Sequence, residues 1–159
     1  LTMGYAIFST SMAQGDAFRD ASRLTMERAR TRISVANINN SLDGEGTSVT
    51  VYANNTGETL ISRPSQMDIL VRYTQADGSL AIKRLVYAAA CPPAGDEWCL
   101  AGWSPDSFNP SLWDPGEQAT LNLNLAPSML CQSPATVVIV APNGVTTLGN
   151  FTSSQQCPP

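Results

Sequence analysis

The spacing of hydrophobic residues changes near residue 32, which divides the chain into two parts. From Asp16 onward, apolar side chains recur every three or four positions, at Ala17, Phe18, Ala21, Leu24, Ala29 and Ile33. This spacing is typical of one face of an α-helix. Residues 1–13, ahead of this stripe, are largely apolar and carry no charge. We therefore predict one long helix over residues 1–31.

Opposite charges in the second half of this helix are three or four residues apart. The candidate pairs are Asp16 with Arg19, Asp20 with Arg23, Arg23 with Glu27, and Glu27 with Arg30. Such pairs stabilise a solvent-exposed helix face. The same segment is rich in arginine, at Arg19, Arg23, Arg28, Arg30 and Arg32. These charges form either a solvated, self-paired face or a ring of ion pairs between subunits, and the sequence leaves both possibilities open.

After Arg32 the hydrophobic period falls to two, which is the period of a β-strand. Short stretches rich in β-branched and aromatic residues follow, namely RISVANI, TSVTVYA, MDILVRY, SLAIKRLVY, ATLNLNL, ATVVIVA and VTTLGNF. Turn-forming sequences such as LDGEG, ADGS, DPGE and PNG separate them. About seven short strands at this spacing predict an antiparallel, immunoglobulin-like β-sandwich over residues 32–159. The predicted fold class is mainly β with a long N-terminal α-helix.

The stretch from residue 88 to residue 114 lacks a clear strand pattern, and we expect a long loop here, held by a disulfide. The chain has four cysteines, none of them in a Cys-x-x-Cys pair, and an even number in such surroundings favours disulfides formed in an oxidising compartment. Four cysteines allow three pairings, and four reduced thiols are the alternative. We favour Cys91–Cys99, which closes the sequence CPPAGDEWC, and Cys131–Cys157, which ties the C-terminal tail to the domain.

The chain contains no histidine and has a formal net charge of -4. Without histidine it lacks the commonest general base, the nucleophilic triads that depend on it and the usual zinc ligand. Its acidic character disfavours nucleic acid. Two acidic pairs, Asp43 with Glu45 and Asp96 with Glu97, do not have the spacing of an EF-hand calcium loop. We therefore predict no enzymatic activity, no cofactor, no metal site and no nucleic-acid partner.

The sequence YANNTGETLI interrupts a strand with turn-forming residues. We predict a turn in which Gly57 or Asn55 has a positive φ. The sequence NNT that begins at Asn54 is also an acceptor for N-glycosylation, as are those that begin at Asn39 and Asn150. A glycan is bulky and hydrophilic, so its asparagine must face solvent. We expect Asn54 and Asn39, near predicted strand ends, to be better acceptors than Asn150.

Several segments resemble the archaellum proteins, a family that comprises the archaellins and the related stator components. These segments are ERARTRISVANINNSLDG, VTVYANNTGETLI, MDILVRY, LWDPGEQATLNLNL and TVVIVAPNGVTTLGNF. The Asn-Thr-Gly turn after a strand and the Trp-x-Pro-Gly-Glu turn before a Thr/Leu strand are the most suggestive features. The resemblance implies a type-IV-pilin-like helical stalk, a β-sandwich head and a part in an assembled surface structure used for motility, without catalysis by the subunit.

From this resemblance we expect a structural subunit of an extracellular archaellum-like filament, which serves motility or surface attachment and binds copies of itself through its helix. It would meet a membrane only before assembly. One alternative is an archaellum stator or anchor protein whose head binds the cell-surface layer, and another is a soluble binding module with a helical extension. Two features depart from the archaellins, a short apolar segment and the cysteine-bearing loop, and the first leaves room for a stator. The predicted assembly residues are Leu1, Met3, Tyr5, Ile7, Phe8, Met12 and Phe18.

Overall fold

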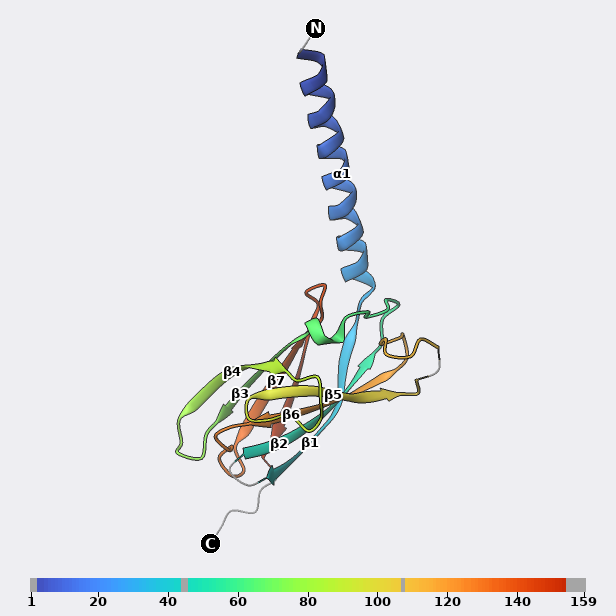
Figure 1. The fold of residues 1–159 in the computed structure, drawn as a ribbon. Coiled ribbons are helices and arrows are strands. Elements are labelled where there is room, and N and C mark those ends of the chain that lie inside the picture. The colour runs from blue at the N-terminus through green and yellow to red at the C-terminus, as the bar shows by residue number, and fades with distance from the viewer. Residues whose placement is uncertain (1–2, 44–45, 107, 154–159) are drawn as a thin grey trace.

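The computed structural model describes residues 3–43, 46–106 and 108–153, with side chains described for 16–41, 47–106 and 108–153. Helix α1, Met3–Arg30, comes first and stands out from a β-rich head (Figure 1). Within the described residues the head contains β1 Ile33–Asp43, β2 Gly46–Asn55, β3 Asp68–Thr74, β4 Leu80–Tyr87, β5 Glu97–Ser104, β6 Gln118–Leu125, β7 Pro134–Val140 and β8 Thr146–Thr152, with a short 3-10 helix, η1, at Pro64–Gln66. The prediction of a mainly β fold is confirmed.

The strands form an eight-stranded mixed sheet in the order β1-β2-β6-β5-β4-β3-β7-β8. All neighbours pair antiparallel except β4 and β5, which run parallel and share the pairs Val86 with Glu97 and Tyr87 with Trp98. The prediction of an entirely antiparallel head is therefore wrong at this place. Residues 88–96 loop back after β4, so that β5 begins beside the end of β4 and continues in the same direction.

The sheet curls until its two edge strands, β1 and β8, lie alongside each other. The side-chain amide of Asn40 on β1 donates a hydrogen bond to the carbonyl of Thr152 on β8, over 3.0 Å. A Cβ at Gly149 would lie only 2.8 Å from side-chain carbons of Val35 and Ile38. A residue without a side chain is needed at this point because β8 and β1 approach so closely.

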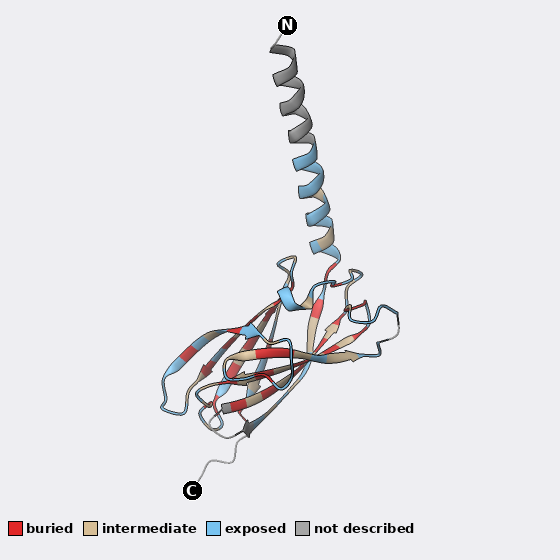
Figure 2. Cartoon of the chain, viewed as in Figure 1, coloured by how far each residue is buried: buried red, intermediate tan, exposed pale blue. Residues whose placement is uncertain are grey.

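In β2, β3, β6 and β7 every second residue points into the core. β3 and β7 alternate between buried and more exposed positions. Figure 2 shows buried and exposed positions interspersed along the strands of the head. This alternation follows from the pleat of a strand, whose successive side chains point to opposite faces. In β6 the buried positions are Ala119, Leu121, Leu123 and Leu125. The curled sheet thus encloses one core, and its outer surface is left to face solvent or partners.

The stretch 88–114 is not a continuous loop, because β5 lies within it. A bulge between Leu100 and Gly102 interrupts the register of β5 with β6. The consecutive residues Trp98 and Cys99 precede the bulge and are both buried, since Cys99 is bonded to Cys91 of the loop before β5. A period-two pattern is therefore absent from the sequence of this strand.

Candidate functional site

The end of α1 is fastened to the head by the turn that follows β2. Three backbone amides of this turn donate hydrogen bonds to the helix–strand junction: Thr56 and Gly57 to the Arg32 carbonyl, over 2.9 and 3.0 Å, and Glu58 to the Arg30 carbonyl, over 2.9 Å. The last carbonyls of a helix lack partners within the helix. The turn therefore caps α1 and attaches it to the head at the same time.

Gly57 is needed in this turn because of space. A Cβ at Gly57 would lie 2.5 Å from the carbonyl oxygen of Arg30 and 2.5 Å from the nitrogen of Arg32. The prediction of a positive φ is wrong, since neither Gly57 nor Asn55 has one. The Asn55 side chain instead accepts a hydrogen bond from the Gly57 amide, over 3.2 Å. Such an Asx turn reverses the chain without a left-handed residue.

Asn55 is fully buried and joins this turn to the Trp-x-Pro-Gly-Glu turn at 113–117. Its side-chain amide donates to the carbonyls of Thr59 and Trp113, over 2.9 and 3.1 Å. Its backbone accepts from the Gly116 amide and donates to the Glu117 carbonyl, over 2.8 and 2.9 Å. Sequence reasoning missed this role of Asn55, although an amide at an inward-facing position of β2 was a signal for it.

The turn between β7 and β8 also holds the helix end. The Arg28 Nε donates to the backbone carbonyl of Asn143 over 2.6 Å. The side-chain amide of Asn143 donates to the Thr31 hydroxyl over 2.7 Å. That hydroxyl donates in turn to the carbonyl of Glu27 over 2.8 Å. Two turns that are distant in sequence thus form hydrogen bonds with the last turn of α1. Together these bonds fix the direction of the helix relative to the head.

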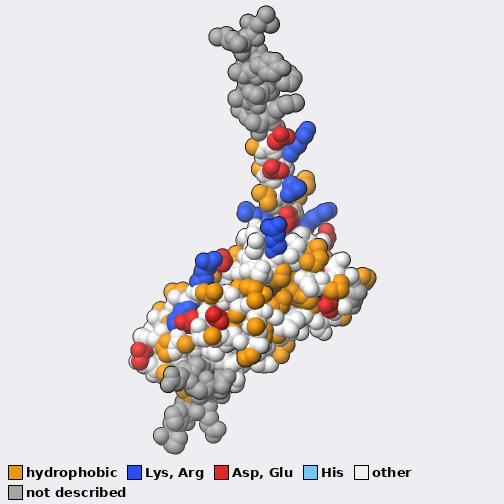
Figure 3. Space-filling model, in the orientation of Figure 1, with side chains coloured by type: hydrophobic (Ala, Val, Ile, Leu, Met, Phe, Trp, Pro, Cys, Tyr) orange, Lys and Arg blue, Asp and Glu red, His pale blue; other side chains and the backbone are white. Residues whose placement is uncertain are grey.

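Above this attachment the described part of α1, residues 16–30, is exposed apart from the half-buried Ser22 and Glu27. Phe18 is 76% exposed and Met26 is 68% exposed. Figure 3 shows basic side chains along this half of the helix and where it meets the head. Apolar and charged side chains of α1 therefore both lack cover within a single copy of the chain.

The predicted ion pairs of the helix are only partly present. Among the described residues, Asp16 and Arg19 lie 3.9 Å apart, as the sequence predicted. Arg30 pairs with Glu58 of the head, over 3.7 Å, and not with Glu27. This second ion pair adds an exposed contact between the head and the helix.

The other predicted assembly residues cannot be placed by their side chains. Leu1 lies outside the described residues. Five more residues belong to the backbone of α1 but their side chains lie outside the described set: Met3, Tyr5, Ile7, Phe8 and Met12.

No helix in the described part of the chain is both long enough and apolar enough to cross a membrane.

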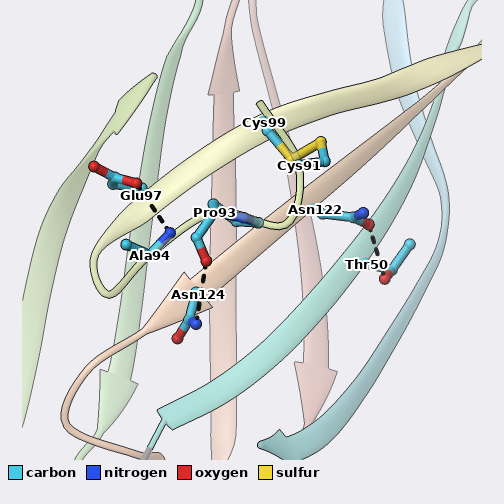
Figure 4. Close-up of a disulfide and its surroundings, with 8 residues drawn as sticks. All are labelled: Thr50, Cys91, Pro93, Ala94, Glu97, Cys99, Asn122 and Asn124. Atoms are coloured by element: carbon cyan, nitrogen blue, oxygen red, sulfur yellow. Dashed lines mark hydrogen bonds between the residues drawn. A yellow bond between two sulfur atoms is a disulfide. The ribbon is translucent and has the colours of Figure 1, made fainter. Parts of the chain in front are cut away.

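Cys91 and Cys99 form a disulfide with their Cα atoms 5.7 Å apart, which is the pairing that the sequence favoured. The bridge folds the loop before β5 back onto that strand (Figure 4). The Asn124 side chain on β6 donates to the Pro93 carbonyl of the same loop over 3.4 Å. Cys131 is disulfide-bonded as well, while Cys157, its predicted partner, lies outside the described residues.

The three glycosylation sequons all lie in strands. Asn39 on β1 and Asn150 on β8 are exposed, and both strands are edges of the sheet. Asn54 on β2 is half-buried, and its side-chain oxygen accepts a hydrogen bond from Gln118 over 3.0 Å. Asn39 lies well inside β1, not near its end. By exposure alone, Asn150 is a better acceptor than Asn54.

The only lysine of the chain forms a polar cluster at the edge of the core. Lys83 pairs with Asp96 over 2.5 Å and also contacts the Ala126 carbonyl. Burial is the largest single influence on Lys83 and opposes its charge, but the hydrogen bonds and charges of Asp96 and Tyr73 together outweigh it and raise the lysine pKa. Burial also raises the pKa of Tyr73, whose hydroxyl donates to the Pro127 carbonyl over 3.1 Å.

The cluster is structural in character, because every group in it has a partner. It connects β4 to the loop before β5 and to the segment that follows β6. In the acidic pair of Asp96 and Glu97, Asp96 forms an ion pair with Lys83. Glu97 accepts a hydrogen bond from the backbone amide of Ala94 over 2.9 Å. Glu45 lies outside the described residues. Across the described ranges, no three Cys, Asp or Glu side chains are grouped so that they could hold a metal ion.

No protein-family model and no curated protein matches the sequence. Solved structures do match. The archaellum periplasmic stator protein FlaG from Sulfolobus acidocaldarius has a TM-score of 0.55 and 21% identity, covering 76% of this chain and 99% of that one. In the complex of FlaF and FlaG from the same organism the TM-score and identity are equal, covering 76% of this chain and 89% of the other.

Two filament proteins match to a similar degree. The archaeal flagellum of Methanospirillum hungatei strain JF1 has a TM-score of 0.59 and 13% identity, covering 95% of this chain and 82% of that one. The archaeal flagellin FlaB1 from Methanocaldococcus jannaschii has a TM-score of 0.57 and 14% identity, covering 77% and 90%. At these identities the likeness concerns the fold, and this chain therefore has the fold that archaellum filament and stator proteins share.

Proposed function

We propose that the chain is a structural subunit of an extracellular, archaellum-like filament that serves motility or surface attachment. In this proposal residues 1–31 form the pilin-like assembly stalk, and residues 32–159 form an immunoglobulin-like β-sandwich head that faces outward. The subunit performs no catalysis, binds no metal or cofactor, and meets a membrane only before assembly. Its disulfides and its sequons at Asn39, Asn54 and Asn150 suit an exposed, oxidising location outside the cell.

The observation that carries this proposal is the helix itself. The described half of α1 leaves Phe18, Leu24 and Met26 exposed, although each would be more stable out of water. The segment ahead of it, residues 3–13, contains no charged residue. A helix that is apolar on all sides is stable when it is buried on all sides. Neighbouring copies of the same helix supply such burial in a filament.

The way the head holds the helix supports the same proposal. A subunit of a regular array must present its assembly element in one orientation, because repeated heterologous contacts otherwise fail to propagate. The hydrogen bonds of Gly57 with Arg32 and of Asn143 with Thr31 give α1 one direction. The arginines of the second half then lie where the helix leaves the packed part. There they are either solvated or paired with acidic residues of neighbouring copies.

The second candidate is an archaellum stator or anchor protein whose head binds the cell-surface layer. The likeness to the stator protein FlaG favours it, since 99% of that chain is matched here. A stator needs a partner on another structure, and it does not need a contact that propagates from copy to copy. The formation of fibres therefore distinguishes a filament subunit from a stator or anchor protein.

Negative-stain electron microscopy of the full chain tests the proposal. We expect long uniform fibres from the natural chain and their loss in Ile7→Asp, Phe8→Asp and Phe18→Asp, with the head still folded by circular dichroism. Ala76→Asp, which adds the same charge at an exposed position in the turn between β3 and β4, is the control and should still assemble. Isolated particles from the natural chain would favour the stator, and normal fibres from the aspartate variants would remove the helix from assembly.

A further inference from the structure

The head carries two exposed apolar features on different sides. The first is Phe108, which is 82% exposed and lies in the loop between β5 and β6, of which residues 105–106 and 108–112 are described. The second is the outer surface of the half-sheet β4-β3-β7-β8. In Figure 1 the loop lies at the right of the head, whereas β3 and β4 lie at the left. A large exposed apolar surface often marks a site of protein association.

The Phe108 loop is held firmly at its base. The side chain of Asp114, which is buried, accepts hydrogen bonds from the Asn109 backbone amide over 3.1 Å and from the Asn109 side chain over 3.0 Å. Trp103 and Trp113, on either side of the loop, stack with ring centroids 5.6 Å apart. Phe108 is thus the outward-pointing neighbour of an anchored residue. A rigid base lowers the entropy cost of placing an aromatic side chain in a partner.

The outer surface of the half-sheet is apolar across several adjacent strands, and we call it the apolar sheet face. The register places Leu70 of β3 beside Val138 of β7, and Val138 beside Leu148 of β8. On β4 the exposed residues include Ile82, at 68%, which pairs with Arg72 on β3. The members of the apolar sheet face are Leu70, Leu80, Ile82, Val86, Val138, Val140 and Leu148.

The two features carry opposite charges. Arg72 is exposed within the apolar sheet face, and it takes part in none of the ion pairs among the described residues. The neighbouring acid, Asp68, is already bound by Arg84 over 2.5 Å. On the loop, Asp106 is exposed close to Phe108 and likewise lacks an ion pair within the described set. An aromatic residue beside an acid thus faces an apolar surface that contains a cation.

We propose that the Phe108 loop of one copy binds the apolar sheet face of a second copy, with Asp106 of the first pairing with Arg72 of the second. The loop and the face occupy different sides of the head, so each contact leaves one loop and one face free. Such a heterologous contact extends in rows. The inference deepens the proposed function by naming the contact between heads, in addition to the helix contacts.

Cysteine crosslinking of the full chain tests this contact. The natural cysteines Cys91, Cys99 and Cys131 are already bonded. A variant with Phe108→Cys and Ile82→Cys should give, on mild oxidation, a ladder of covalent dimers, trimers and larger species. The control pairs Phe108→Cys with Ser62→Cys, which is exposed ahead of η1 and lies beside the end of α1, outside the apolar sheet face. A ladder equal to that of the control, or no ladder, would overturn the proposal.

Reversal of the two charges in the proposed ion pair tests the same contact independently. In the crosslinking variant, Asp106→Arg or Arg72→Asp alone should reduce the ladder, and the two together should restore it. In a chain with natural cysteines, Phe108→Ser should weaken association of heads by about 30-fold, as loss of an aromatic anchor does. Unchanged association, measured by sedimentation, would contradict the proposal.

The result can be separated from that of the proposed function. Fibres without a ladder would leave the filament intact and remove this contact between heads. A ladder without fibres would retain the contact and remove the filament. Dimers without higher species would show an isologous contact, and would overturn the proposal of rows.

Discussion

Gly57 lies so close to Arg30 that a Cβ on the glycine would stand 2.5 Å from the arginine carbonyl oxygen. The contact is made by backbone atoms alone. The turn after β2 also donates three hydrogen bonds to the same few residues. The head therefore holds the helix through main-chain geometry, which a change of side chain at Arg30 or Arg32 leaves in place.

Replacement of Gly57 by alanine should loosen this attachment. The added methyl group meets backbone atoms, which cannot move aside as a flexible side chain would, and overpacking of this kind costs about 1–3 kcal/mol. We expect Gly57→Ala to lower the free energy of unfolding in urea by an amount in that range. Thr56→Ala, at the exposed neighbouring residue, keeps the backbone hydrogen bonds and should change it little. Equal stability of the two variants would contradict the close contact.

Loss of the disulfide in the loop before β5 should destabilise the head. The bridge closes a short loop, and bridges of this kind contribute about 2–3 kcal/mol. Replacement of both Cys91 and Cys99 by serine should reduce the free energy of unfolding by that amount, without the free thiol that a single replacement leaves. Intact mass with and without reductant gives the number of bridges in the natural chain, and four free thiols would contradict both predicted pairings.

The sequence predicted the mainly β fold because most strands bury alternate side chains on one face. It did not predict β5, since the burial of both Trp98 and Cys99 interrupts the alternation there. Nor did it predict the parallel pairing of β4 with β5, because pairing between strands leaves no local pattern. The attachment of the helix was also missed. It joins Arg28 to Asn143 and Arg30 to Glu58, and contacts between such distant residues are decided by tertiary packing.

Stability should fall at alkaline pH because of Lys83 and Tyr73. Both have a pKa raised in the folded state, so their contribution is complete below the unfolded pKa values of about 10 and is lost as pH rises through the folded ones. We expect unfolding temperature to decline above about pH 10, and Lys83→Met to make the decline shallower. Arg84→Met removes an exposed cation on the same strand and should leave the decline unchanged. An unfolding temperature of the natural chain that is the same at about pH 8 as above about pH 10 would contradict the prediction.

Glycans should be found on the two edge strands. Asn39 and Asn150 are exposed, whereas the Asn54 side chain is half-buried and bonded to Gln118. We therefore expect higher occupancy at Asn39 and Asn150 than at Asn54 when native protein is analysed by peptide mass spectrometry. Asn150 shares its cross-strand row with Arg72 of the apolar sheet face, so its glycan should be confined to copies whose face binds no second head. Glycans at these positions would also shield the sheet edges from pairing with other strands. Three unmodified peptides would remove the prediction altogether, and occupancy at Asn54 alone would reverse its order.

The continuity of α1 with β1 has a mechanical consequence. Only Thr31 and Arg32 separate the helix from the strand, so a pull on the helix acts along the axis of β1. The register from Ile33 opposite Asn55 to Asp43 opposite Gly46 then places the hydrogen bonds between β1 and β2 under load side by side. In this shear arrangement many bonds must break together, whereas a pull across the strands would open them one after another. In the proposed filament, a pull on the stalk would therefore reach each head as shear between β1 and β2.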